Sequence, residues 1–225
     1  VYKIPNIGKR FISIDMRKAN FTALVQFGLS HGYEFFDNYD YDKFMRQFTD
    51  IDYFIESKYI RQVVFGNCNC KGNIAYEKEL MTHVMCKIKE ELELTDDAIY
   101  SMCSDEIILY ADEVASKEEK LKELIENYAF PLKLETFALS VVTSAEEGTE
   151  IHNGNIYAYI KELDSGEKEL KCVDPVNLPF VLKLINGKQI TENDLVFFHA
   201  GKLARFIEEP KLRLVREIKT TVKEE

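Results

Sequence analysis

Two short apolar stretches that stop at carboxylates constrain the fold of this chain most. The first covers residues 11–17 and contains Asp15, and the second covers residues 98–110, where Ser104-Asp105-Glu106 interrupts two runs of Ile, Leu, Tyr and Met. Both stretches have the length and the residue types of β-strands, and the interruption predicts a tight hairpin with an acidic tip. Strand ends and hairpin tips are places where a buried sheet exposes side chains without losing its core.

The sequence between and after these stretches predicts an α+β fold. Apolar residues at helical spacing predict helices, and an alternating pattern predicts one more strand. The expected helices cover residues 18–29, 41–66 (as one helix or two), 75–93 and 116–128, and the expected strand covers residues 132–142. The order is βαββαβ, that of a ferredoxin-like domain, with a helical insertion at about residues 30–74. Right-handed crossovers then place the first strand beside the hairpin, so that Asp15 meets Asp105 and Glu106.

After the strand at residues 132–142, the sequence pattern changes from helices and longer strands to short apolar runs separated by turns. Turn residues such as Asp164-Ser165-Gly166 and Asn186-Gly187 separate short apolar runs, which predicts hairpins at about 155–173 and 195–207. We therefore expect two domains, one over residues 1–145 and a small β-rich appendage over residues 150–220. The appendage is expected to recognise an acceptor or to pair subunits in a homo-oligomer.

Composition and charge narrow the classes of partner. The 225-residue chain is 46% hydrophobic and can bury a full core, and its formal charge of −10 disfavours non-specific binding to a nucleic-acid duplex. Small phosphorylated ligands fit this charge better. The five cysteines, an odd number, argue against a disulfide framework and predict a reducing, cytoplasmic setting. No apolar run approaches the roughly 18 residues of a membrane helix, and the motifs of P-loop, Rossmann and common serine hydrolase proteins are missing.

Asp15, Asp105 and Glu106 are the strongest candidates for chemistry. Carboxylates from neighbouring strands supply the oxygen ligands that a hard cation such as Mg²⁺ or Mn²⁺ prefers. Two such ions activate an attacking oxygen and stabilise a triphosphate in two-metal enzymes. The alternative is that Asp105 and Glu106 form only a polar hairpin tip and that Asp15 is only the N-cap of a helix.

Basic residues near these acids are candidates for phosphate binding. Arg17 and Lys18 follow the first strand, and Lys58 and Arg61 lie one helical turn apart, which places them on the same side of a helix. The alternative for all four is a solvated charge. Ser104 either lines a nucleotide pocket or caps the hairpin turn.

The acidic stretches also resemble a known family. Ile14-Asp15-Met16-Arg17, with Phe21, resembles the I-D-G-R-x-F stretch of the tRNA-His guanylyltransferase family, and Ser104-Asp105-Glu106 resembles its S-D-E. The resemblance covers about residues 10–30 and 75–130. It implies a palm domain, which that family shares with class III and GGDEF nucleotide cyclases and with many polymerases. It further implies that Asp15, the backbone carbonyl of Met16, Asp105 and Glu106 bind the metal ions.

The chain departs from the family pattern in two respects. Met16 stands where the family has Gly, so the backbone has less conformational freedom to approach a phosphate. The two acidic stretches are also much farther apart in the sequence, because of the helical insertion.

Together these observations predict a two-metal nucleotidyltransferase. A hydroxyl, which an RNA 5′ or 3′ end can supply, would attack the α-phosphate of a nucleoside triphosphate. A nucleotide cyclase would use the same palm with a hydroxyl of the nucleotide itself. A third hypothesis, from a different class, is a catalytically inert palm-like binding or assembly module, which would show no metal-dependent binding of a nucleoside triphosphate.

Overall fold

The structure is a computed structural model that describes residues 1–33, 40–67, 70–145 and 150–218. The chain forms two compact units, one of residues 11–135 and one that combines residues 1–10 with residues 136–225. The boundaries differ from those expected because one long strand, β4 (Leu132–Ser144), begins in the first unit and ends in the second. The sequence pattern shows this strand but not the change of partners along it.

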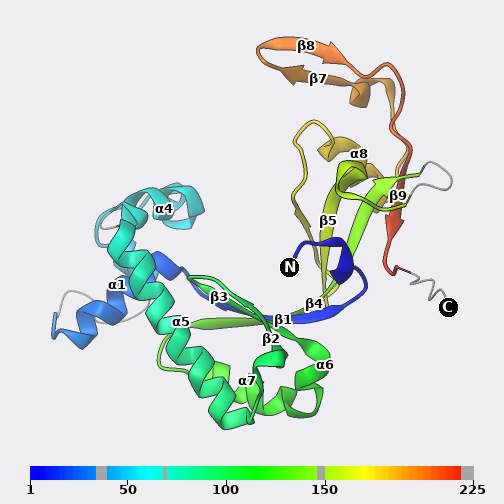
Figure 1. The fold of residues 1–225 in the computed structure, drawn as a ribbon. Helices are drawn as coiled ribbons and strands as arrows, with labels where there is room; N and C mark the ends of the chain where they lie inside the picture. The colour runs from blue at the N-terminus through cyan, green and yellow to red at the C-terminus, as the bar shows by residue number, and fades with distance from the viewer. Residues whose placement is uncertain (34–39, 68–69, 146–149, 219–225) are drawn as a thin grey trace, which may run out of the picture. The chain divides into compact units, whose positions relative to one another are not determined.

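The first unit contains a sheet and the longer helices (Figure 1). Its strands are β1 (Arg10–Met16), β2 (Ile99–Met102), β3 (Glu106–Tyr110) and the beginning of β4. Its helices are α1 (Ala19–Ser30), α2 (Tyr41–Met45), α3 (Asp52–Glu56), α4 (Lys58–Gly66), α5 (Cys70–Leu92), α6 (Ala111–Val114) and α7 (Glu118–Glu126). The mixed α+β class is confirmed, and the strands run in the order β2-β3-β1-β4. β1 pairs with β3, and β2 pairs with β3, both antiparallel.

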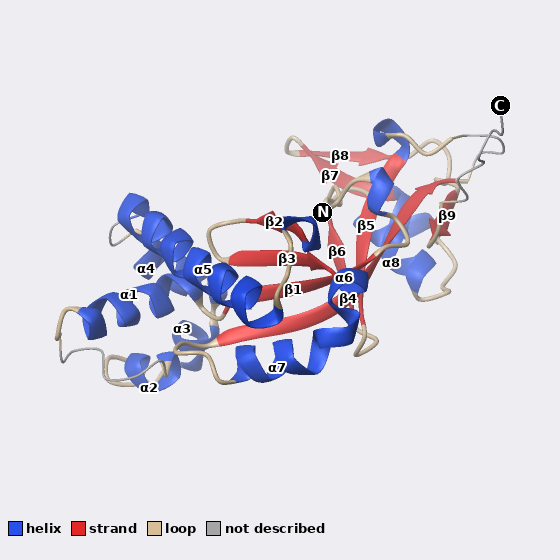
Figure 2. Ribbon diagram, turned by 60° about the horizontal axis from the view of Figure 1, so that its bottom comes forward, coloured by secondary structure: helices blue, strands red, loops and turns tan. Residues whose placement is uncertain are grey.

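One face of this sheet is covered by helices α5 and α7 (Figure 2). Alternate residues of β1, namely Ile12, Ile14 and Met16, belong to a core that also contains Met81 and Val84 from α5. Successive side chains of a strand point to opposite faces, so this set defines the helix-covered face. Burial of these apolar side chains against the two helices fixes the register of β1, since a shift by one residue would expose them.

The expected helical insertion consists of several short helices rather than one or two. α2, α3 and α4 replace the single pattern predicted over residues 41–66, and α5 begins at Cys70, earlier than expected. A small aromatic core holds this part together: Phe21 of α1 contacts Tyr41, Phe44 and Phe65 at ring-centroid distances of 5.3, 5.3 and 5.5 Å. Residues 34–39 and 68–69 of the insertion lie outside the described residues.

The second unit contains the remaining elements. They are the end of β4, with β5 (Ile156–Leu163), β6 (Lys168–Lys171), α8 (Leu178–Ile185), β7 (Val196–His199), β8 (Lys202–Arg205) and β9 (Leu212–Val215). β5 pairs with β4 and β6, β9 pairs with β4, and β7 and β8 form a separate hairpin. The two expected hairpins are thus present, as β5–β6 and β7–β8.

Helix α8 was not expected in the β-rich appendage. Residues 178–185 form a continuous apolar run with Pro179 in the first helical turn, where proline is tolerated because the first amides of a helix lack partners anyway. Phe180 and Val181 are fully buried, and Val181 packs with Ala158 and Ile160 of β5. An apolar run of eight residues does not by itself distinguish a buried strand from a buried helix.

Among the described residues, no helix combines the length and the apolar composition that crossing a membrane requires.

Candidate functional site

The end of β1 and the β2–β3 connection lie side by side in the first unit. Asp15 is the register partner of Glu106, the first residue of β3. The backbone N–H of Met16 donates a hydrogen bond of 2.8 Å to the carbonyl oxygen of Asp105. Asp15 lies inside β1 and α1 begins at Ala19, so Asp15 is not a helix N-cap. The structure therefore brings the three predicted acids, and Met16 with them, to one end of the sheet.

Asp15 and Glu106 occupy the face of the sheet opposite the helices. Ser13, two residues before Asp15 and on the same side of β1, donates a hydrogen bond of 2.6 Å from its Oγ to Oε1 of Glu106. Ser13 is almost completely buried, whereas Asp15 and Glu106 are half-buried. This face thus carries two adjacent carboxylates, one of which is held by a buried hydroxyl.

Asp105 belongs to the connection between β2 and β3 and has different neighbours. Its Oδ1 accepts a hydrogen bond of 3.3 Å from Oγ of Ser104, so Ser104 contacts the carboxylate of the next residue. The charge of Asp105 also acts on Glu77 of α5, a helix that packs on the other face of the sheet. Asp105 therefore lies near an acid that the sequence analysis did not single out.

Glu77 is a buried acid with an unsatisfied oxygen. Its side chain is only 4% exposed, and its Oε1 has no hydrogen-bond partner among the described residues. Burial, with a smaller contribution from the charge of Asp105, raises the pKa of Glu77 from 4.5 to about 7. A buried acceptor without a partner is costly and requires an explanation, and acids with strongly shifted pKa values are common at functional sites.

The side chains, in the positions that the structure gives them, do not form a complete metal-binding site. Within the described ranges, no three His, Cys, Asp or Glu side chains are grouped closely enough to hold a metal ion. The acids instead form two pairs, Asp15 with Glu106 on one face and Asp105 with Glu77 towards the helices. The donor chemistry of both pairs, carboxylate oxygen, is that which Mg²⁺ and Mn²⁺ prefer.

Two of the predicted phosphate-binding cations meet at one tyrosine in the first unit. The Lys18 ammonium lies 4.8 Å and the Arg61 guanidinium 5.5 Å from the centre of the Tyr41 ring. Lys18 also forms an ion pair of 2.8 Å with Asp42. Tyr41 is fully buried, and its hydroxyl has no hydrogen-bond partner in the described part of the chain. Burial raises the pKa of Tyr41, and the positive charge of Arg61 partly opposes this.

The other two predicted cations lie apart from this pair. The Nε of Arg17 donates a hydrogen bond of 3.1 Å to the carbonyl of Leu132, at the start of β4. Lys58 is exposed at the start of α4, the helix that carries Arg61. The expectation that Lys58 and Arg61 share one helix is confirmed, but only Arg61 contacts the Tyr41 ring among the cation–aromatic contacts described for α4.

Glu77 and Tyr41 were missed by the sequence analysis for a common reason. Each lies among apolar residues that pack into a core, and each carries a polar atom with no partner there. A signal for Glu77 was present: it precedes Leu80 and Met81 by three and four residues, which places it on the apolar face of its helix. An acid at such a position requires an explanation.

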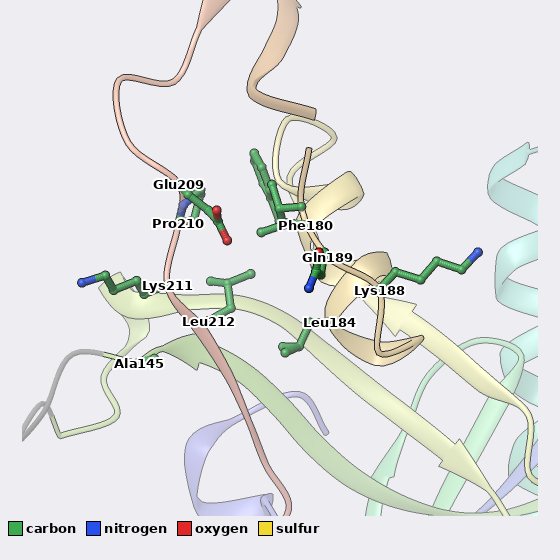
Figure 3. Close-up of a pocket in the computed structure, with 10 residues that line it drawn as sticks. Ala145, Phe180, Leu184, Lys188, Gln189, Glu209, Pro210, Lys211 and Leu212 are labelled. Carbon is green, nitrogen blue, oxygen red and sulfur yellow. The ribbon is translucent and has the colours of Figure 1, made fainter. Parts of the chain in front are cut away.

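A groove in the second unit holds none of the predicted site residues. Its volume is about 640 Å³, and it lies between α8 and the segment that leads into β9. Figure 3 shows Phe180 and Leu184 of α8 facing Leu212, while Lys188 and Lys211 point away from the groove. The lining combines apolar side chains with polar ones such as Gln189 and Glu209, and it brings none of the predicted site residues together.

Comparisons with protein-family models, with curated proteins and with solved structures found no match to this chain.

Proposed function

We propose that the chain is a metal-dependent nucleotidyltransferase with a palm-type domain. The observation that carries the proposal is the pairing of Asp15 with Glu106 and of Met16 N–H with the Asp105 carbonyl, which joins the two acidic stretches at one end of an antiparallel sheet. The strand order β2-β3-β1-β4, with helices on one face, supports it, because a ferredoxin-like palm has this order.

The acids fit a divalent cation by their chemistry. Asp15, Asp105 and Glu106 offer only carboxylate oxygens, and the buried Oε1 of Glu77 nearby has an unsatisfied lone pair. When bound, Mg²⁺ or Mn²⁺ would neutralise phosphate charge and make the attacking hydroxyl more acidic. The role of the protein side chains is then to hold the cation and to position the substrate.

The reaction also needs groups that bind the phosphates of the substrate, and basic side chains of the first unit can supply them. Lys18 follows the end of β1 by two residues, and Arg61 shares its contact with the Tyr41 ring. Both would bind the phosphates of a nucleoside triphosphate. The acceptor hydroxyl would lose its proton to solvent as its oxygen forms a bond to the α-phosphorus. The bond to the bridging oxygen of pyrophosphate would break, and pyrophosphate would leave. Such a transfer needs positioning and charge neutralisation more than covalent chemistry.

The test is the thermal stability of the purified protein with each nucleoside triphosphate, with and without Mg²⁺ or Mn²⁺. A ligand that binds only the folded state stabilises by about 2.7 kcal/mol at a hundredfold excess over its Kd. We expect a nucleoside triphosphate to add stability beyond that of metal alone, and only when metal is present. Asp105→Ala should abolish this added stability, and the exposed control Asp112→Ala should retain it.

The products then identify the acceptor. A cyclic nucleotide formed without any acceptor would establish a cyclase, whereas pyrophosphate release that depends on an RNA end would establish transfer to RNA. If no nucleoside triphosphate stabilises the wild-type protein in the presence of metal, the proposal is wrong and the inert binding module remains.

A further inference from the structure

We propose that Glu77 of α5 and Asp105 of the β2–β3 connection together bind a divalent cation, on the helix side of the acidic sheet edge. This inference deepens the proposed function, because it adds a ligand to the same site. It does not require the transfer reaction, because the pair would bind a cation without nucleotide.

The position of Glu77 carries the argument. It lies on the face of α5 that packs against the sheet, one helical turn before Leu80 and Met81, which share a core with Met16 of β1. The backbone N–H of Met16 is in turn bonded to the carbonyl of Asp105. The charge of Asp105 acts on Glu77, so packing of α5 and pairing of β1 bring these two acids near each other.

The burial of Glu77 provides the second, independent observation. Its side chain is 4% exposed, and its Oε1 has no hydrogen-bond partner among the residues that the structure describes. In a core, Leu or Met at this position would avoid the cost of burying an unpaired polar group. Among the described residues, no cationic side chain forms an ion pair with Glu77, and the acid whose charge acts on it is Asp105, of the same sign.

A bound divalent cation would remove both unfavourable features, the unpartnered oxygen of Glu77 and the repulsion between the two carboxylates. It supplies the missing partner for Oε1 of Glu77 and turns the repulsion between two carboxylates into shared coordination. Hard cations accept backbone carbonyls and water as further ligands, so two carboxylates are a sufficient protein contribution for Mg²⁺ or Mn²⁺. Ser104, which already donates to Asp105, orients that carboxylate.

The experiment is a Mn²⁺ titration of the full chain without nucleotide, in which electron paramagnetic resonance reports the free ion. We expect binding by the wild-type protein, competition by Mg²⁺, and a loss of affinity of more than about tenfold in Glu77→Gln. Asp105→Asn should show the same loss, which keeps the test decisive if Glu77→Gln folds poorly. Glu90→Gln, an exposed acid farther along α5, should bind as the wild-type protein does.

Three results would overturn the inference: no Mn²⁺ binding by the wild-type protein, unchanged affinity in Glu77→Gln, or an equal loss in Glu90→Gln. Failure of the proposed function is distinguishable from these. In that case Mn²⁺ binds and Glu77→Gln weakens it, but no nucleoside triphosphate adds stability. Conversely, a metal-dependent nucleotide effect that Glu77→Gln leaves intact would remove Glu77 from the site and keep the proposed function.

Discussion

Two carboxyl groups, Asp194 in the second unit and Glu77 in the first, have opposite environments. Asp194, in the second unit, accepts hydrogen bonds from Nζ of Lys183 and from the N–H and Oγ of Thr191, the latter two at 2.6 Å. These donors, Lys183 first, lower the pKa of Asp194 from 3.8 to about 2. Glu77, in the first unit, has an unpartnered oxygen and a raised pKa.

The difference separates structural acids from candidate functional ones. Asp194 completes a capping box with Thr191 and ties that turn to α8, so its charge supports local structure. Oε1 of Glu77 has no such donor among the residues that the structure describes. Groups that cost stability persist where function needs them, and Glu77 lies beside the acids that the sequence singles out.

The largest expected effect comes from removing the polar group of Glu77. We predict that Glu77→Leu raises the free energy of unfolding by about 1–3 kcal/mol in metal-free solution, because it removes an unsatisfied buried acceptor. Chemical denaturation in the presence of a chelator measures this. Stabilisation by Mn²⁺ should disappear in the same variant.

The control for this prediction is a change of the same kind on an exposed residue. Glu79→Leu, two residues away on the exposed side of α5, should change the free energy of unfolding by less than about 0.5 kcal/mol. Marked destabilisation by Glu77→Leu would contradict the comparison, since it would mean that Glu77 is well satisfied in the fold.

A smaller effect is expected at Glu106, which has a partner. Ser13→Ala removes the hydroxyl that donates to Glu106 and should lower the free energy of unfolding by about 1 kcal/mol, the net value of one hydrogen bond. Denaturant unfolding measures the change. If Ser13→Ala leaves the free energy of unfolding unchanged, this hydrogen bond does not stabilise the fold. Glu106 would then resemble Glu77 rather than stand between Glu77 and Asp194.

The smallest effect is expected at Asp194, because its ion pair with Lys183 remains partly exposed and is therefore partly screened by solvent. The folded-state pKa lies below the unfolded value of 3.8, so the unfolded state binds more protons in acid. The stabilisation is present above about pH 4 and is lost as the pH falls towards 2. Thermal melts of the wild type and Asp194→Asn should therefore differ at pH 6 and converge near pH 2.

The sequence predicted much of the first unit because short-range patterns, namely apolar runs, helical spacing and turn residues, indicate its strands and helices. β1, the β2–β3 hairpin and β4 follow from apolar runs and turn residues, and their order follows from chain connectivity. The adjacency of Asp15 and Glu106 then needs only the register that the buried Ile12 and Ile14 impose.

Other features depend on packing between distant residues. Glu77 appears in the sequence as one polar residue in an amphipathic helix, and only the position of α5 over the sheet brings it near Asp105. The contact of Lys18 and Arg61 with the Tyr41 ring likewise depends on how α4 packs against α1. Helix α8 was missed because a short apolar run favours neither helix nor strand.

The most direct test of the central claim is a crystal of the protein grown with Mn²⁺, with anomalous diffraction recorded at the manganese edge. The account predicts an anomalous peak on the helix side of the sheet, within bonding distance of carboxylate oxygens of Asp105 and Glu77. A crystal at saturating Mn²⁺ with no peak there, or with peaks only at exposed acids elsewhere, would contradict it.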